Sequence, residues 1–84
     1  MKIVDVVVGK RLSLSDQPAV IVIQEASAYK SEIWVEKEGK KANAKSLLGV
    51  LSLGLVAGCS VKICAEGEDE IEAIRRLEEL VKAN

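Results

Sequence analysis

The 84-residue sequence contains no histidine and no phenylalanine, a single proline and two cysteines. Without an imidazole to act as a base, the Ser-His and Cys-His classes of nucleophilic enzyme are excluded. Aromatic side chains are limited to Tyr29 and Trp34, so Val, Ile, Leu and Ala must fill the core. A chain of this length forms one small domain, residues 1–84, and buries only about 60–65% of its unfolded surface, so that core must be well filled.

The two cysteines, Cys59 and Cys64, lie five residues apart and form no Cys-x-x-Cys motif. On one strand an odd offset points side chains to opposite faces, so we expect the two sulfurs not to bond to each other. With no histidine to complete a zinc site, the sequence predicts no metal and no other cofactor. Residues 1–11 become charged too soon for a signal peptide. We therefore expect a cytoplasmic protein with two reduced, packed thiols.

Charge is balanced overall but unevenly placed. The net charge of −1 lacks the strong basic excess that is typical of nucleic-acid-binding domains. Residues 37–45 are rich in lysine and residues 66–82 in acids, as in a solvated turn beside a solvated helix. Residues 46–61 carry no charge, but these sixteen residues, interrupted by glycine and serine, are too few to span a membrane. We expect no direct contact with nucleic acid or membrane.

The first third of the chain predicts a strand followed by a helix. Residues 2–8 are rich in β-branched side chains, which favour a strand. Residues 15–29 are ambiguous, because their "AVIVI" run alone favours a strand. A cap at Ser15 or Asp16 and a proline, Pro18, in the first turn favour a helix instead. The pattern predicts a helix.

The middle of the chain predicts a hairpin, a short helix and a strand. Ile33 and Val35 alternate with Trp34 and Glu36 before a Glu38-Gly39 turn, after which a short second strand completes a hairpin. Ser46 is a suitable N-cap for a helix of less than two turns that Gly54 ends. Residues 61–66 alternate again and predict the fourth strand.

Residues 68–84 have the clearest helical pattern. Asp69 and Glu72 have the spacing of a capping pair, and Glu72 with Arg76 has that of an i,i+4 ion pair. The expected buried face holds Ile71, Ile74, Leu77 or Glu78, and Val81. The element order is therefore β-α-β-β-α-β-α, which indicates an α+β fold: a four-stranded, mostly antiparallel sheet with three helices on one face.

Two predicted helices begin with serine, Ser15 and Ser46. A helix start presents unpaired N–H groups and partial positive charge, so it favours phosphate. A phosphoserine at the cap adds about −1.5 to −2 charge at that point. The helix after Ser46 is too short to bury apolar residues on every side, so some leucines among residues 47–51 should be exposed and mark a partner surface.

The whole chain resembles the HPr family of bacterial phosphotransferase-system phosphocarriers, and in particular its catabolite-repression branch, the Crh proteins. The stretches "PAVIVIQEAS", "NAKSLLGVLSLG" and "AEGEDEIEA" carry the resemblance. The resemblance implies the HPr-like open-faced β-sandwich, and it favours a helix over residues 19–23.

In that family the first helix opens with a Gly-Ile-His-Ala-Arg-Pro-Ala type motif whose histidine relays phosphate from Enzyme I. This chain reads "SLSDQPA" there, with Ser15 at the place of the histidine and Gln17 at that of the arginine. Pro18 matches, and Asp16 replaces a small neutral residue. A phosphate ester on serine is too stable to pass on, and the charge of Asp16 repels incoming phosphate. The resemblance therefore implies a degenerate transfer site with no catalytic residue.

The family's second site is intact in this sequence. In Gram-positive HPr and in Crh, the serine that opens the short helix is phosphorylated by HPr kinase/phosphorylase. The phosphoserine form then binds a LacI-type catabolite control repressor. The resemblance implies that Ser46 is this serine and that its partner surface is formed by Lys45, Leu47, Leu48 and Leu51. The family's arginine also contributes to repressor docking, so Gln17 is a departure that bears on this partner.

The sequence thus predicts a non-enzymatic regulator of carbon catabolite control whose signal is phosphorylation of Ser46. Two alternatives remain open. One is a phosphocarrier that acts through Asp16 or Ser15. The other is an unphosphorylated structural or dimerising module, since the chain is expected to be a monomer or a strand-exchanged homodimer.

Overall fold

Four strands form one antiparallel sheet with the spatial order β1-β4-β2-β3. The computed structural model describes residues 1–84. Each neighbouring pair of strands is antiparallel and continuous in register. The strands are β1 (Lys2–Val7), β2 (Glu32–Lys37), β3 (Lys40–Asn43) and β4 (Ser60–Glu66).

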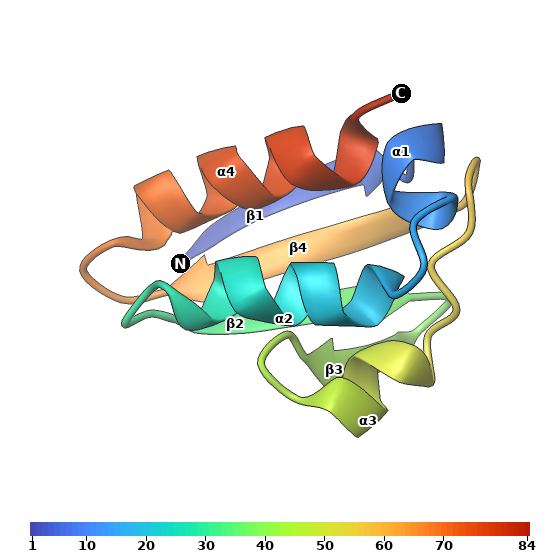
Figure 1. The fold of residues 1–84 in the computed structure, drawn as a ribbon. Coiled ribbons are helices and arrows are strands. Elements are labelled where there is room, and N and C mark those ends of the chain that lie inside the picture. Colours follow the sequence, from blue (N-terminus) through green and yellow to red (C-terminus); the bar gives the residue numbers. More distant parts are fainter.

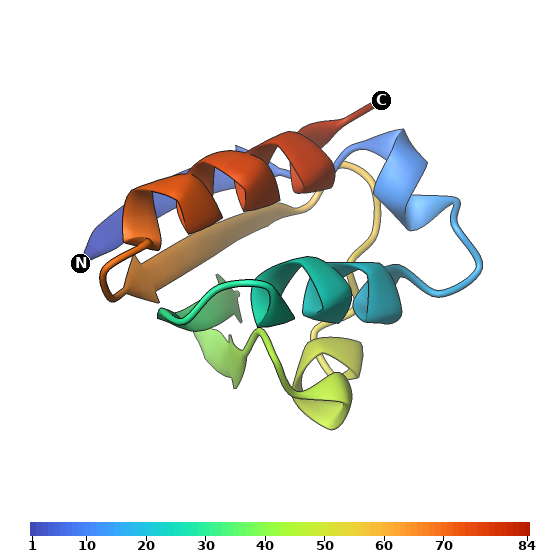
Figure 2. The same ribbon diagram turned by 60° about the vertical axis from the view of Figure 1, so that its left-hand side comes forward.

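The helices gather on one side of this sheet, as the α+β prediction requires. Figures 1 and 2 show α2 and α4 lying across one face, with α3 beside β3. None of the helices has the length and apolar character needed to cross a membrane. They are α1 (Lys10–Ser13), α2 (Pro18–Ser27), α3 (Leu47–Leu51) and α4 (Glu70–Lys82).

The core lies between the sheet and the helices. Every second residue of the central strands β2 and β4 points inward, among them the fully buried Ile33 and Ile63. The helices meet them with small or branched side chains, such as Ala26 of α2 and Leu77 of α4, both without solvent exposure. Burying one such Leu or Ile contributes about 1.5–3 kcal/mol. A core without phenylalanine is therefore filled by close approach of helix and sheet.

The hairpin between β2 and β3 turns where the sequence predicts. Glu38 has φ of 51° and Gly39 has φ of 79°, the two positive values of a type I′ turn, whose twist matches that of the flanking strands. The strand over residues 61–66 and the short helix after Ser46 are also confirmed.

The start of the second segment differs from the prediction. The short helix α1 was not expected, and α2 begins at Pro18 with Gln17 as its N-cap residue, so neither Ser15 nor Asp16 caps it. The physical reason is that the Ser15 hydroxyl donates to the carbonyl of Leu12 and so belongs to the end of α1.

The helix α1 is held by the end of α4. The N–H of Gly9 donates to Val81 O at 2.8 Å, and that of Arg11 to Ala83 O at 3.2 Å. The N–H of Lys10 donates to Asn84 Oδ1 at 3.3 Å. The first N–H groups of one helix thus pair with the last carbonyls of another, which satisfies groups that neither helix can satisfy alone.

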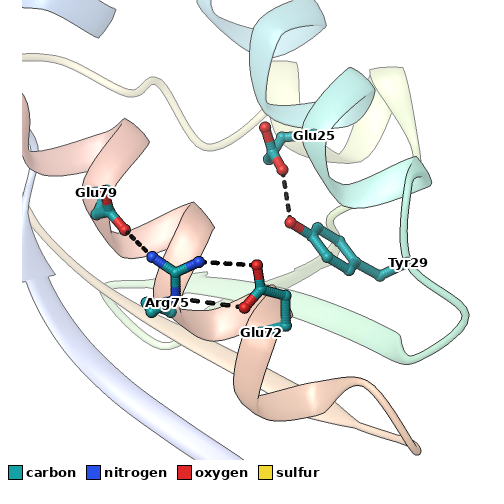
Figure 3. Close-up of polar contacts among 5 residues, drawn as sticks. All are labelled: Glu25, Tyr29, Glu72, Arg75 and Glu79. Atoms are coloured by element: carbon teal, nitrogen blue, oxygen red, sulfur yellow. Dashed lines mark hydrogen bonds and ion pairs between the residues drawn. The ribbon is translucent and has the colours of Figure 1, made fainter.

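Two predictions for α4, its buried face and its ion pair, need correction. Ile71 is 70% exposed, and Ala73 is buried in its place beside Ile74, Leu77 and Val81. The guanidinium of Arg75, not that of Arg76, pairs with Glu72, at 2.8 Å, and also with Glu79, at 2.9 Å (Figure 3). Because Arg75 lies three residues after Glu72 and four before Glu79, it bridges both carboxylates.

Asp69 occupies the N-cap position of α4 but makes no side-chain bond to that helix, so the predicted capping pair with Glu72 is wrong. Its carboxylate accepts hydrogen bonds from the N–H of Lys30, the N–H of Ser31 and the Ser31 hydroxyl. Asp69 therefore ties the start of α4 to the segment that enters β2.

Candidate functional site

The start of α2 is the first of the two candidate sites. Gln17 adopts φ of −139° and ψ of 74°, and Pro18 follows as the first helical residue. No side chain caps this helix, so its first N–H groups have no partner within it. A proline here is well placed, because it has no N–H to leave unpaired.

Ser15 points away from the start of α2. Its hydroxyl donates to Leu12 O at 2.7 Å, and its N–H donates to the same carbonyl at 3.2 Å. Asp16 and Gln17 are exposed, and neither forms an ion pair or a side-chain hydrogen bond. Ser15, Asp16 and Gln17 are therefore near one another in the chain without forming a polar cluster.

A shallow hollow joins the start of α2 to α3. It has a volume of about 290 Å³. Its lining residues are Asp16, Gln17, Pro18, Ala19, Val20, Leu47 and Leu51. The structure thus brings three of the four transfer-motif residues next to two leucines of the predicted partner surface. Ser15 is not among the lining residues.

The start of α3 is the second candidate site, and here the predicted cap is present. The Ser46 Oγ accepts a hydrogen bond from the N–H of Gly49 at 3.3 Å. The Ser46 N–H donates to Asn43 O at 3.0 Å, and Asn43 Oδ1 accepts from the N–H of Lys45 at 2.8 Å. This sequence of turns sets the entry of the chain into α3 and leaves Ser46 half-buried.

The leucines after Ser46 are exposed, as the brevity of the helix predicts. Leu47 is 46% exposed, Leu48 79% and Leu51 56%, whereas Val50 is buried. A helix of five residues turns only one side chain fully into the core. The three leucines form an apolar patch of the kind that marks a partner surface. We call Leu47, Leu48 and Leu51 the leucine patch.

Lys45 extends from the start of α3 toward the end of α2. Its Nζ donates to Tyr29 O at 2.7 Å. The Tyr29 hydroxyl in turn donates to Glu25 Oε2 at 2.8 Å (Figure 3). Burial of the ring and this bond to a carboxylate raise the pKa of Tyr29, so the phenol remains a neutral donor. Lys45, the residue before Ser46, therefore links the start of α3 to the end of α2.

Two further lysines act where the sequence predicts only a solvated turn. Lys37 Nζ donates to Gly54 O at 2.6 Å, and Lys40 Nζ to Ser52 O at 3.5 Å. Cations near the carbonyl end of a helix complement its dipole. These contacts join residues more than ten positions apart, so no local pattern could have predicted them.

Comparison with known proteins gives a consistent match over almost the whole chain. The family model described as the PTS HPr component phosphorylation site matches residues 4–83. The HPr-like protein Crh of Bacillus subtilis is 43% identical over 67 residues, which cover 80% of this chain and 79% of that protein.

Solved structures agree with this match. The crystal structure of the phosphocarrier protein HPr from Bacillus anthracis has a TM-score of 0.89 at 36% identity and covers 96% of each chain. The crystal structure of Crh from Bacillus subtilis, described as a dimer with a swapping domain, has a TM-score of 0.71 at 40% identity. It covers 88% of this chain and 80% of that chain.

Proposed function

The chain belongs to the HPr family, in its Crh-like branch, and from this premise we propose that it is a non-catalytic regulator of carbon catabolite control switched by reversible phosphorylation of Ser46. The observation that carries the proposal is the position of Ser46, which caps α3 directly beside the leucine patch. The proposal places the protein in the cytoplasm, where its two free thiols remain reduced.

Phosphorylation at this position would change the surface strongly. A phosphoryl group adds about −1.5 to −2 charge, and the N-terminal end of α3 accommodates negative charge better than its other end. The added charge would stand beside apolar side chains that otherwise present no charge to a partner. A binding protein could therefore distinguish the two forms by charge while using the same leucines for contact.

In this proposal, the residues at the start of α2 do not transfer phosphate. The chain has no histidine, and the Ser15 hydroxyl is directed to Leu12 O. Ser15, Asp16, Gln17 and Pro18 are thus proposed to be a relay site that no longer relays.

The proposed partners are an HPr kinase/phosphorylase, which modifies Ser46, and a LacI-type catabolite control repressor, which reads the result. Lys45 and the leucine patch are the proposed contact residues. Gln17 lies in the wall of the hollow beside this patch, so an uncharged amide would face a partner where the family presents an arginine. We expect repressor binding to be weaker than that of an arginine-bearing relative.

Incubation with ATP and an HPr kinase/phosphorylase tests the proposal directly. The parent protein should take up one phosphoryl group, and Ser46→Ala should take up none. Ser52→Ala is the matched control, because Ser52 lies at the other end of α3 with its hydroxyl bonded to Gly49 O at 2.7 Å. Uptake by Ser46→Ala equal to that of the parent, or no uptake by the parent, would refute the proposal.

Asp16 supports a second candidate, a residual phosphocarrier. Its carboxylate is exposed at the start of α2 and lines the hollow, and an acyl phosphate there would be labile enough for onward transfer. Phosphoenolpyruvate with Enzyme I should then label the protein, and Asp16→Asn should abolish the label. Ser15→Ala distinguishes a label on Ser15, which as an ester would survive treatment with hydroxylamine, whereas an acyl phosphate on Asp16 would not.

A third candidate is an unphosphorylated dimerising module. The observation in its favour is the dimer that is described for the related Crh crystal structure. Sedimentation of the parent protein over a wide concentration range decides between a monomer and a strand-exchanged homodimer. Reversible phosphorylation of Ser46 in either state would retain the regulatory proposal.

A further inference from the structure

The face of the sheet opposite α2 and α4 carries no helix (Figures 1 and 2). Since side chains alternate along a strand, the residues that point to this open face follow from the buried ones between them. The strand register then arranges them in rows that run across the sheet. The outward residues are Ile3, Asp5 and Val7 of β1, Ser60, Lys62, Cys64 and Glu66 of β4, Glu32, Trp34 and Glu36 of β2, and Lys41 and Asn43 of β3.

One row is apolar. Ile3 and Trp34 are the partners of Cys64 on its two sides. No helix covers Cys64, yet it is only 8% exposed, because the side chains of Ile3 and Trp34 cover it from both sides. Ile3 itself is 51% exposed. We call Ile3, Cys64 and Trp34 the apolar stripe.

The row on one side of the apolar stripe is electrically balanced. Asp5 faces Lys62, Lys62 also faces Glu36, and Glu36 faces Lys41. The charges alternate in sign across all four strands, so each has an opposite neighbour, which favours pairing. No ion pair is formed within this row, but none of its charges faces a charge of the same sign on a neighbouring strand.

The row on the other side is not balanced. Glu32 is directly opposite Glu66, both are exposed, and neither takes part in any ion pair or side-chain hydrogen bond. Like charges directly opposite on neighbouring strands destabilise a sheet. The sheet therefore carries an unrelieved pair of carboxylates next to the apolar stripe.

A hollow lies where Glu32 meets the apolar stripe. Its volume is about 320 Å³, and its lining residues are Glu32, Ile33, Trp34, Asn43 and Lys45. The Trp34 ring already accepts a cation, since Lys41 Nζ lies 4.8 Å from its centroid. The Lys45 ammonium is bonded to Tyr29 O. Of the two charged side chains that line the hollow, Lys45 is thus held by a carbonyl and keeps its positive charge, whereas the carboxylate of Glu32 has no hydrogen-bond or ion-pair partner.

We propose that the open face is a docking surface for a partner polypeptide in which an arginine stands next to an aliphatic residue. The aliphatic side chain packs on the apolar stripe, and the arginine binds Glu32 and Glu66. A guanidinium suits this place better than an ammonium, because it pairs with carboxylates in two-point geometry. This surface does not include the leucine patch, which lies on α3, although Lys45 lines its hollow.

Charge complementarity argues against a second copy of this chain as the occupant. The same face of a second copy would bring two more glutamates, and its lysines, Lys62 and Lys41, are already part of the balanced row. The chain's arginines lie elsewhere, in α1 and α4. Self-association through two open faces would therefore set carboxylates against carboxylates.

NMR titration of the isotope-labelled protein with the peptide acetyl-Leu-Arg-Leu-Arg-amide tests the proposal. The expected result is saturable shifts of the Trp34 indole N–H and of the backbone amides of Ile3, Glu32, Cys64 and Glu66. The double variant E32Q/E66Q should weaken binding by about tenfold or more, because the charge-assisted bonds are lost. E38Q/E78Q removes the same charge from two glutamates without ion pairs and should bind like the parent.

Acetyl-Leu-Glu-Leu-Glu-amide should cause no saturable shifts. Equal binding of both peptides, equal weakening by both double variants, or shifts confined to the leucine patch would overturn the proposal. So would a concentration-dependent dimer of the free protein that E32Q/E66Q abolishes, which would identify a second copy as the occupant.

Thermal unfolding provides a readout that does not depend on the peptide. Glu32→Lys places opposite charges across the strand pair and should raise the unfolding midpoint while abolishing peptide binding. A lower midpoint would show that the fold itself uses the carboxylate of Glu32, and would contradict the proposal.

Discussion

The Asp69 carboxylate shows how one side chain can join distant segments. It accepts three hydrogen bonds from Lys30 and Ser31, almost forty residues earlier in the chain. Ser31 is only 2% exposed, so its hydroxyl depends on this carboxylate for a partner. The interaction closes the end of the sheet where α2, β2 and α4 meet.

We predict that Ser31→Ala lowers the free energy of unfolding by about 1 kcal/mol, because a buried hydrogen bond is lost without leaving an unsatisfied donor. Urea unfolding followed by circular dichroism measures the change. Ser27→Ala, at the exposed end of α2, serves as the control and should be close to the parent. Equal stability of Ser31→Ala and the control would contradict the role of this bond.

The same carboxylate gives a pH dependence with a definite sign. The hydrogen bonds from Ser31 and Lys30 lower the pKa of Asp69, so the native state binds fewer protons there than the unfolded state. Its contribution to stability is therefore complete above the ordinary carboxyl pKa of about 4 and is lost as the pH falls through the depressed value. Asp69→Asn should unfold at a lower temperature than the parent at neutral pH, and the difference should shrink in acid.

Glu70 adds to this acid sensitivity in the same direction. The Gly67 N–H and the amino terminus at Met1 lower the pKa of Glu70, and both contacts lie at the start of α4.

Thermal melts of the parent and of Asp69→Asn between neutral pH and about pH 3 check the predicted pH dependence of Asp69. A difference that grows in acid would contradict it.

The sequence could indicate that the Asp69 carboxylate accepts hydrogen bonds at the start of a helix, but not which groups donate them. Its spacing from Glu72 is that of a capping box, and the local pattern cannot show that Ser31 lies closer. The same limit applies to Arg75 and Arg76, since either can reach a glutamate at helical spacing. Tertiary contacts decide between alternatives that are equal along the chain.

At the scale of elements, α3 is a case in which local sequence, rather than tertiary contact, determines the structure. Its start, its cap and its exposed leucines all follow from local sequence, because a five-residue helix has little tertiary context. Gly49 also fits for a packing reason: a Cβ there would lie 3.3 Å from the Cβ of Ala42 and 3.4 Å from Ser46 Oγ.

We predict that Ser46→Ala lowers the free energy of unfolding by about 1 kcal/mol, the usual result of removing a helix cap. Ser46→Asp should keep most of this stability, because its carboxylate can accept the same N–H bond and suits the helix dipole. Thermal melts of the three proteins measure the order. Ser46→Asp less stable than Ser46→Ala would show that negative charge at this position is unfavourable, contrary to the proposed switch.

The helix α1 could not be predicted, because its stability comes from α4. Four residues cannot form a stable helix alone, and the partners of its N–H groups lie at the opposite end of the sequence. The prediction of a cap at Ser15 or Asp16 failed for the same reason: residues 10–13 form a turn of their own that uses Ser15 at its end.

Gly9 is where α1 meets the end of α4. A Cβ at this position would lie 2.1 Å from Ala83 O, a clash that only separation of the two segments can relieve. We predict that Gly9→Ala lowers the free energy of unfolding by about 1–3 kcal/mol and raises amide exchange at residues 81–84. Arg11→Ala, which keeps the backbone bond to Ala83, is the control and should show neither effect.

At the scale of the whole molecule, the four-stranded antiparallel sheet and the placement of the helices on one face follow from the sequence pattern together with the family resemblance, whereas the spatial order of the strands was not predicted. Alternation in β2 and β4 identifies one buried face, and the helical periodicity of α4 supplies a surface to cover it. What the pattern could not show is that the start of α2 and α3 share one hollow. That juxtaposition depends on how both helices pack on the sheet.

For the molecule as a whole, the central claim of the proposal is that Ser46, beside the leucine patch, is the phosphorylated residue and that residues 15–18, which contain no imidazole, relay no phosphate. The most direct measurement exposes the protein to both phosphoryl donors at once, ATP with an HPr kinase/phosphorylase and phosphoenolpyruvate with Enzyme I, and locates the phosphate by fragmentation mass spectrometry under neutral conditions. We predict a single phosphoryl group on Ser46. Phosphate on Ser15 or Asp16, with Ser46 unmodified, would contradict the account.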